Sequence, residues 1–146
     1  MRNYSLEIYR QLLTSVKRGR AVVGLSKAKP IFLISLIDYV PFLNENAIEF
    51  DCGSFKAFYK SNNDFFSPEN KSGYEVPFYH LHTEPFYHLL WKCDDVVEQI
   101  QHTPSAKLLR ENLLYAKLDD ELWELLQDAA NREYLKQAII DQYLKD

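Results

Sequence analysis

The stretch 77-PFYHLHTEPFYHL-89 contains the word PFYHL twice, eight residues apart, and holds three of the four histidines of the chain. Two strands over residues 77–82 and 86–91, joined by a turn, would make a β-hairpin with one copy of the word in each arm. The loop length would set the register: three residues would pair His80 with His88, whereas two would place them on opposite faces. The repeat therefore predicts an aromatic hairpin.

Histidines that share one face of a hairpin are also candidates for a metal site. Only the three-residue loop would bring His80, His82 and His88 onto one face, the minimum for zinc bound by three imidazoles. Neither arm contains Asp or Glu, and neither Cys52 nor Cys93 belongs to a CxxC pair. We therefore expect these histidines to form hydrogen bonds with backbone or water, and we predict no metal ion and no other cofactor.

The composition is that of one compact domain. At 146 residues and 47% hydrophobic, the chain can bury a core, and four glycines and six prolines leave no low-complexity linker. No apolar run approaches the roughly 18 residues of a membrane helix, so no membrane partner is expected. The opening MRNYSLEIYR lacks the apolar region of a secretory signal, which predicts a cytoplasmic protein with Cys52 and Cys93 as free, buried thiols.

Charge is unevenly distributed along the chain. The net charge is −4, yet residues 1–30 carry seven Lys or Arg against one acid, Glu7. These cations are Arg2, Arg10, Lys17, Arg18, Arg20, Lys27 and Lys29. The remaining residues carry ten Lys or Arg against twenty Asp or Glu. A basic region on an acidic body is typical of a polyanion-binding protein, and the alternative interpretation is a solvated basic helix and loop.

Hydrophobic periodicity predicts mostly helices before the repeat. A first helix with Ser5 as its N-cap is expected to end at Arg18-Gly19. Residues 30–40, PIFLISLIDYV, are apolar nearly all round and predict a buried helix. Residues 44–50, NENAIEF, resemble a short turn and strand, and residues 54–66, SFKAFYKSNNDFF, resemble an aromatic amphipathic helix.

The part of the chain from about residue 94 is predicted to be helical, with a break at Thr103-Pro104. Acidic residues at Asp119-Asp120 suit a helix start, and Asn131 is placed to cap a last helix over REYLKQAIIDQYL. The fold prediction is therefore α+β: a mainly helical single domain with a small antiparallel β-hairpin or sheet.

No catalytic motif accompanies these elements. The chain has no GxSxG, HExxH, Walker or GxGxxG motif. Asp119, Asp120 and Glu121 are better explained by the helix dipole than by a metal, and the His and Asn arrangement of an HNH nuclease is missing. We therefore predict a binding domain without catalytic residues, and not an enzyme in itself.

Four words, in this order, resemble a known family. They are RGRAVVGLSKAKPIFLISLID, NAIEF, VPFYHLHTEPFYHL and LLYAKLDDELWELLQDAANREYLKQAIIDQYL, and together they extend over nearly the whole chain. The sequence resembles the DNA sulfur-binding domain of phosphorothioate-dependent HNH (type IV) restriction endonucleases. The resemblance implies that residues 1–146 read duplex DNA in which sulfur replaces a non-bridging phosphate oxygen. A linked or partner HNH nuclease, which uses a divalent metal, would then cut the DNA.

The resemblance also implies a binding site. The family's sulfur pocket is built around the proline of its PF motif, here Pro77, with Val76 and His80 as neighbours. Better-known members have tyrosine at the place of Val76 and a small residue at that of His80. Lys29 corresponds to the family's cation before the proline of the AKP word, and Ala28 precedes it.

The physical chemistry of sulfur agrees with such a pocket. Sulfur is larger, more polarisable and less strongly hydrated than the oxygen it replaces, so an apolar wall of proline and valine favours it. Cations near the pocket are expected to neutralise flanking phosphates, and polar aromatic side chains to touch base edges or sugar. The predicted DNA-binding residues are Arg18, Arg20, Lys27, Ala28, Lys29, Tyr79 and His82.

The sequence thus predicts a DNA-modification reader that acts in modification-dependent restriction. Two alternatives stay open at this point. One is a domain of the same fold that reads unmodified or otherwise modified DNA, and the other is a protein-interaction domain whose aromatic hairpin binds a partner chain. Salt dependence separates the second alternative from DNA binding, because phosphate contacts release counterions.

Overall fold

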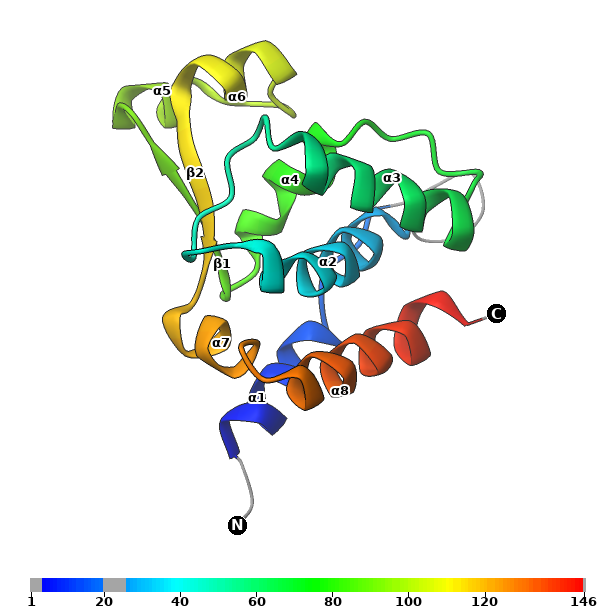
Figure 1. Ribbon diagram of the computed structural model, residues 1–146. Helices are drawn as coiled ribbons and strands as arrows, with labels where there is room; N and C mark the ends of the chain where they lie inside the picture. The colour runs from blue at the N-terminus through cyan, green and yellow to red at the C-terminus, as the bar shows by residue number, and fades with distance from the viewer. Residues whose placement is uncertain (1–3, 20–25, 146) are drawn as a thin grey trace.

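The computed structural model describes residues 4–19 and 26–145. Within these ranges the chain forms eight α-helices and one two-stranded antiparallel sheet, joined by short 3₁₀ and π turns (Figure 1). The predicted mainly helical α+β fold is confirmed. No helix in the described ranges is long and apolar enough to cross a membrane.

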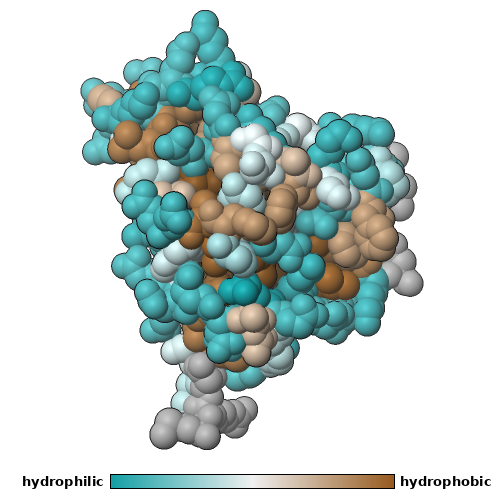
Figure 2. All heavy atoms as spheres, in the orientation of Figure 1, coloured by the Kyte–Doolittle hydropathy of each residue, from teal (hydrophilic) through white to brown (hydrophobic). Residues whose placement is uncertain are grey.

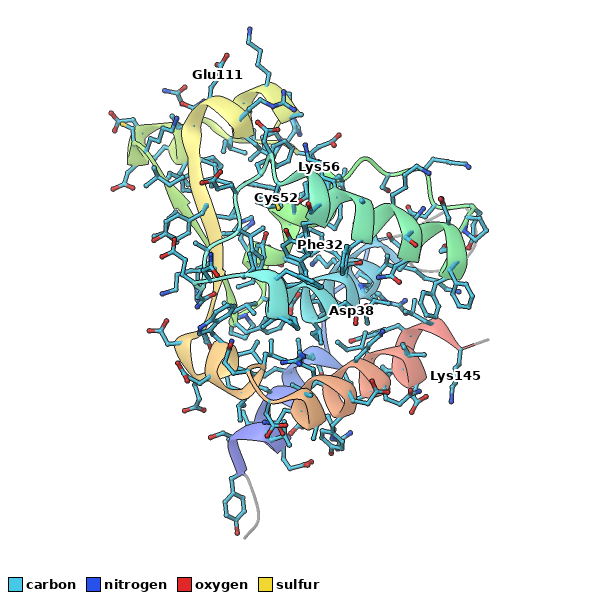
Figure 3. All side chains as sticks on the ribbon, viewed as in Figure 1. Phe32, Asp38, Cys52, Lys56, Glu111 and Lys145 are labelled. Carbon is cyan, nitrogen blue, oxygen red and sulfur yellow. The ribbon has the colours of Figure 1, made fainter. Side chains whose placement is uncertain are left out.

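Helix α2 (Ala28–Tyr39) forms the centre of the molecule. Its sequence is apolar nearly all round, and all but two of its twelve residues are buried. Helices α3 (Gly53–Phe66) and α4 (Glu75–His80) pack on one side of it and α8 (Ala129–Ile139) on the other (Figure 1). Asp38, one of the two half-buried residues, faces α8 and forms an ion pair of 3.0 Å with Lys136 (Figure 3). The predicted buried helix and the aromatic helix α3 are both confirmed.

A second helical layer lies across α2. It consists of α1 (Tyr4–Leu13), α7 (Asp120–Leu125), α8 and the π turn Ile140–Leu144 (Figure 1).

Three predictions about the ends of these helices are wrong: Ser5 as an N-cap, Arg18-Gly19 as a helix end and Asn131 as a cap. Helix α1 contains Ser5 and ends at Leu13, before the predicted Arg18-Gly19, because the N–H groups of Val16 and Lys17 bind side chains from elsewhere in the fold. Helix α8 is capped by Asp128, whose Oδ1 accepts the N–H of Ala130 at 2.7 Å. Asn131 lies inside that helix and donates its side-chain amide to the Leu125 carbonyl.

The repeated word PFYHL does not form a hairpin. Its first copy lies in α4 and the following 3₁₀ turn Leu81–Thr83, whereas its second copy enters strand β1 (Tyr87–Trp91). Pro77 is tolerated in the first turn of a helix, where its missing N–H has no partner to bind. The second copy becomes a strand because a partner is available: β1 pairs antiparallel with β2 (Leu113–Leu118).

Strand β2 occupies part of the region that was predicted to be entirely helical. It follows α5 (Asp94–Gln99) and α6 (Ala106–Asn112), and its sequence LLYAKL suits a helix as well as a strand. Pairing decides the outcome, since Ala116 lies opposite Leu89 on one side and exchanges two backbone hydrogen bonds with Ile48 on the other. The segment predicted as turn and strand, residues 44–50, contributes this single bridge and no strand, and a 3₁₀ turn, Val40–Phe42, precedes it.

Aromatic rings fill the core between α2, α3, α4 and β1. The ring of Phe32 on α2 lies in this interior (Figure 3), 5.1 Å from Phe55, 5.9 Å from Phe78 and 6.1 Å from Tyr87, centroid to centroid. Phe78 belongs to the first copy of the repeated word and Tyr87 to the second. The buried Tyr87 hydroxyl donates a hydrogen bond of 2.5 Å to the Phe78 carbonyl, so the second copy holds the first in place.

Hydrophilic residues cover most of the face drawn in Figure 2, and hydrophobic residues show between them in small patches. Both cysteines are free, as predicted. Cys52 is half-buried beside the Tyr39 hydroxyl, whereas Cys93 is exposed, so the expectation that both thiols are buried is wrong. Cys93 directly precedes α5 at the surface.

Candidate nucleic-acid interface

A groove of about 450 Å³ lies between the start of α2, helix α4 and the segment that follows α1. The residues that line it are Lys17, Arg18, Gly19, Ser26, Ala28, Lys29, Ser72, Val76, Pro77, His80 and Thr83. Three lysine or arginine residues and no acidic residue contribute to this lining. Three of the five described cations among residues 1–30 therefore meet on one concave surface, to which α4 adds apolar side chains.

One wall of the groove comes from α4. Val76 and His80 are four residues apart and so lie one turn apart on the same face of the helix, with Pro77 beside Val76. Pro77 is buried, and Val76 and His80 are half-buried. The three residues predicted to form the sulfur pocket are thus brought together by a helix and not by the predicted hairpin.

The opposite wall comes from the first turn of α2. Ala28 is buried, and the Lys29 ammonium lies 3.5 Å from Glu84 Oε2 and 3.4 Å from the Thr83 hydroxyl. Burial lowers the pKa of the Lys29 ammonium, and nearby Lys17 lowers it further, while the Glu84 carboxylate acts in the opposite direction. Lys29 is therefore a partly desolvated cation at the edge of the groove, 14% exposed, with one carboxylate beside it.

A third side comes from the segment that follows α1. The backbone N–H of Val16 binds the Tyr143 hydroxyl at 2.9 Å, and the N–H of Lys17 binds Glu84 Oε2 at 3.0 Å. The Arg18 guanidinium lies over the Tyr143 ring, 4.8 Å from its centroid. Three consecutive residues are therefore held by buried side chains, which gives a segment without regular structure a defined position.

His80 closes one end of the groove. Its Nε2 lies 2.6 Å from the Thr103 hydroxyl, in the loop between α5 and α6. Burial lowers the pKa of the His80 imidazole, and the neighbouring Lys29 and His82 add to the effect, so the ring is neutral at neutral pH. A neutral ring beside Val76 and Pro77 keeps this end of the groove largely apolar.

The other predicted DNA contacts lie around the groove or outside the described residues. The Tyr79 ring lies edge-on to His80 and tilted against His82, with centroid distances of 5.0 Å and 4.5 Å, but neither Tyr79 nor His82 lines the groove. Lys27 precedes the groove residue Ala28 and is half-buried. Arg20 lies outside the described residues.

The histidines of the repeated word do not gather. His82 Nδ1 lies 2.6 Å from the Tyr79 carbonyl, and His88 Nε2 lies 2.5 Å from Asp119 Oδ1. Neither His82 nor His88 lines the groove. Within the described ranges, no group of three or more His, Cys, Asp or Glu side chains is arranged to hold a metal ion.

Sequence reasoning missed several residues of the groove. Lys17, Gly19, Ser26, Ser72 and Thr83 line it but were not predicted to do so. Lys17 is one of the seven cations of residues 1–30 and directly precedes Arg18, which was predicted to bind DNA. That position beside a predicted cation is the sequence signal that could have identified Lys17. Small polar residues such as Ser72 carry no comparable signal, because only the fold brings residues 72 and 26 to one surface.

Comparison with known proteins adds to this geometry. No family model matches the sequence, and a comparison with curated proteins finds no match. Two solved structures share the fold. The sulfur binding domain of ScoMcrA complexed with phosphorothioated DNA is 13% identical, with a TM-score of 0.65 over 92% of this chain and 86% of that one. The sulfur binding domain of SprMcrA complexed with phosphorothioated DNA is 15% identical, with a TM-score of 0.66 over 96% and 86%.

The protein has the fold of a sulfur-binding domain.

The shared fold confirms the resemblance seen in the sequence words and extends over most of the chain. In this fold the groove lies between the start of α2, which carries the AKP word, and α4, which carries most of the first PFYHL word. The residues implied by the resemblance around the sulfur, Val76, Pro77 and His80, therefore share one surface with the implied cation Lys29.

Proposed function

We propose that residues 1–146 form a reader of duplex DNA that carries a phosphorothioate linkage, and that the groove between α2 and α4 holds the modified phosphate. The sulfur would contact Val76, Pro77 and the side of the His80 ring. Lys29 and Arg18 would neutralise phosphates, with Lys27, Tyr79 and His82 at the periphery. A phosphate contact from Arg20 stays a prediction from the sequence. A linked or partner HNH nuclease would cut the DNA that this domain binds, as part of modification-dependent restriction.

The observation that carries the proposal is the composition of the groove lining. A phosphorothioate diester presents one negative charge together with a soft, weakly hydrated atom. The groove offers cations on one side, including a Lys29 that is only 14% exposed, and the apolar Val76 and Pro77 on the other. Its volume of about 450 Å³ is of the order of a small ligand and accommodates a phosphate with its sugar neighbours.

Discrimination between sulfur and oxygen follows from the apolar wall. An oxygen placed against Val76 and Pro77 loses its hydration without gaining a hydrogen bond, which is costly for a charged group. A sulfur at the same place loses less hydration and gains more dispersion contact, because it is larger and more polarisable. The cations act equally on both duplexes, so they set the affinity and the apolar wall sets the preference.

The fold supports a binding role rather than a catalytic one for this chain. Two solved structures that share this fold are the sulfur binding domains of ScoMcrA and SprMcrA, each complexed with phosphorothioated DNA. No described group of His, Cys, Asp or Glu side chains offers the ligand set that metal-dependent cleavage needs. Cutting would therefore fall to another domain or subunit.

A comparison of matched duplexes tests the proposal. Replacing one non-bridging oxygen makes the phosphorus a stereocentre, so three duplexes of one sequence are needed: the unmodified duplex and the two separated diastereomers. We expect tighter binding of one diastereomer, because only one orients its sulfur toward the apolar wall. Equal affinity for all three, over several base contexts, would contradict the proposal and favour a reader of unmodified DNA. Binding that does not weaken with salt would favour a protein-interaction domain.

A further inference from the structure

A buried carboxylate lies beside a groove that we propose to bind an anion. Glu84 is 7% exposed and directly follows the 3₁₀ turn Leu81–Thr83, where its N–H binds the Leu81 carbonyl at 2.9 Å. A negative charge at this place repels a phosphate, and a buried carboxylate is costly unless it is paired and hydrogen-bonded. A carboxylate at this position must therefore make contacts that offset both the repulsion of phosphate and the burial of its charge.

The contacts of Glu84 indicate what that role is. One oxygen, Oε2, accepts the backbone N–H of Lys17 at 3.0 Å and lies 3.5 Å from the Lys29 ammonium. Lys17 belongs to the segment after α1, and Lys29 to the first turn of α2, twelve residues further along the chain. A single carboxylate oxygen thus joins two of the three sides of the groove.

Side-chain contacts hold the central residues of the described segment 14–19, and Glu84 provides the contact with the Lys17 backbone. The Val16 N–H binds the Tyr143 hydroxyl, and the Arg18 guanidinium lies over the Tyr143 ring. Between these two residues, the Lys17 N–H donates its hydrogen bond to Glu84. Residues 14–19 form no regular secondary structure, and backbone hydrogen bonds hold Thr14, Ser15 and Gly19. Between them, contacts with Tyr143 and Glu84 hold Val16, Lys17 and Arg18. Removal of the Glu84 contact would leave the direction of the Lys17 side chain undetermined.

We propose that Glu84 is the positioning residue of the groove: its buried carboxylate holds the Lys29 ammonium and the Lys17 backbone so that both cations face the phosphates of bound DNA. This inference rests on the proposed DNA-binding function and adds to it the residue that arranges the cations. Glu84 itself touches no phosphate.

The charges around Lys29 make the role measurable. Lys17 and Arg18, in the segment after α1, line the groove together with Lys29, as does His80 of α4. Glu84 approaches Lys29 from the end of the turn that follows α4. Tyr143 of the C-terminal π turn in turn lies close to Glu84. Burial and, to a smaller extent, Lys17 disfavour the charged form of Lys29 and lower its pKa, and Glu84 is the group that favours the charged form. Without the carboxylate, Lys29 should lose its proton at a lower pH than in the unmutated protein.

Glu84→Gln separates positioning from simple charge repulsion. The amide oxygen of glutamine still accepts the Lys17 N–H, but the negative charge beside Lys29 is gone. Repulsion alone predicts tighter DNA binding by this variant, because one negative charge near the phosphates has been removed. Positioning predicts the opposite, a loss of about fivefold in affinity for the sulfur-containing duplex at neutral pH. Glu124→Gln, an exposed change on α7, is the matched control and should leave affinity unchanged.

A second background tests whether Lys29 transmits the effect. In a Lys29→Met protein there is no ammonium left for Glu84 to hold, so adding Glu84→Gln should no longer weaken binding and should strengthen it slightly. In a Lys29→Arg protein the guanidinium stays charged at every pH used, so Glu84→Gln should no longer make binding pH-dependent. As pH rises, the Glu84→Gln single variant should lose affinity at a lower pH than the unmutated protein does, because Lys29 loses its proton earlier.

Thermal unfolding of each variant reports whether it is folded. If Glu84→Gln does not fold, Glu84→Asp replaces it, since the shorter side chain keeps the charge but moves it away from Lys29 and Lys17, and binding should again weaken. Unchanged or tighter binding by the folded variant, or the same loss in the Lys29→Met background, would overturn the inference while leaving DNA reading intact. If the unmutated protein bound none of the three duplexes, the proposed function and this inference would both fail.

Discussion

Replacement of Val76 by serine should reduce the preference for sulfur without reducing the binding of unmodified DNA. Val76 is half-buried in α4 and points into the groove beside Pro77, so its methyl groups form part of the apolar wall. Serine removes both methyl groups and adds a hydroxyl, which can hydrogen-bond to an oxygen but offers less to sulfur.

The size of the effect follows from the apolar contact that is lost. A sulfur atom that covers one valine side chain removes about 30 to 40 Å² of apolar surface from water, and at ~25 cal/mol per Å² this contributes about 1 kcal/mol. That value corresponds to roughly a fivefold loss of affinity for the preferred sulfur diastereomer, because 1.4 kcal/mol is about tenfold at 25 °C. The unmodified duplex has no such contact to lose, so its affinity should stay within about twofold.

Fluorescence anisotropy with the three matched duplexes at one salt concentration measures the ratio directly. Val97→Ser is the matched control, because Val97 lies on α5, is 41% exposed and does not line the groove. Equal losses for the sulfur and unmodified duplexes would mean that Val76 shapes the groove in general and does not read sulfur. An unchanged ratio in a folded Val76→Ser protein would refute the reasoning about the apolar wall.

Four further predictions concern the cations, histidine, stability and cleavage. Lys29→Ala should weaken all duplexes alike and lower the slope of log affinity against log salt by about 1, and an unchanged slope would place the phosphate contacts elsewhere. Because the pKa of His80 lies below its ordinary 6.5, affinity should rise only when the pH falls well below neutral, as the ring gains a proton, and His80→Gln should remove that rise in a pH titration. Tyr87→Phe removes the hydroxyl that binds the Phe78 carbonyl and should lower the free energy of unfolding in urea by about 1 to 3 kcal/mol; a change near zero would show that the carbonyl is satisfied without it. Incubation of the protein with phosphorothioated plasmid and Mg²⁺, Mn²⁺ or Zn²⁺ should leave the DNA uncut, and cleavage abolished by substitutions in this chain would refute a pure binding role.

Local pattern predicted those helices whose residues need no distant partner to define them. Helix α2 is apolar on every side, and such a helix is stable only in an interior, so its place at the centre followed from composition. Helix α3 alternates aromatic and polar residues with a helical period, which predicts one buried face in whatever fold contains it.

Contacts with residues far apart in the sequence decided where helix α1 ends and whether the sheet forms. Helix α1 does not continue to Arg18-Gly19 because Tyr143 and Glu84 bind the backbone N–H groups of Val16 and Lys17, and neither partner is visible from the local sequence. Strand β2 has a sequence that fits a helix, and it became a strand through pairing with β1 on one side and Ile48 on the other.

For the groove, the sequence words alone named Val76, Pro77, His80, Ala28 and Lys29 through resemblance to a family, and the fold brings all five to one surface. The spacing of the words carried no information on Lys17, Ser72 or Thr83, because their approach depends on how α1, α2 and α4 pack.

The repeated word separates the two kinds of information most clearly. The sequence by itself determined that both copies of PFYHL are rich in core residues, and the phenylalanine of each copy, Phe78 and Phe86, is fully buried. The tertiary structure decided that the first copy is a helix and the second a strand, since five identical residues have identical local preferences and only their surroundings differ. The first copy lies in helix α4, which packs on α2 and carries Pro77 in its first turn. The second copy lies beside β2, whose backbone groups need hydrogen-bond partners.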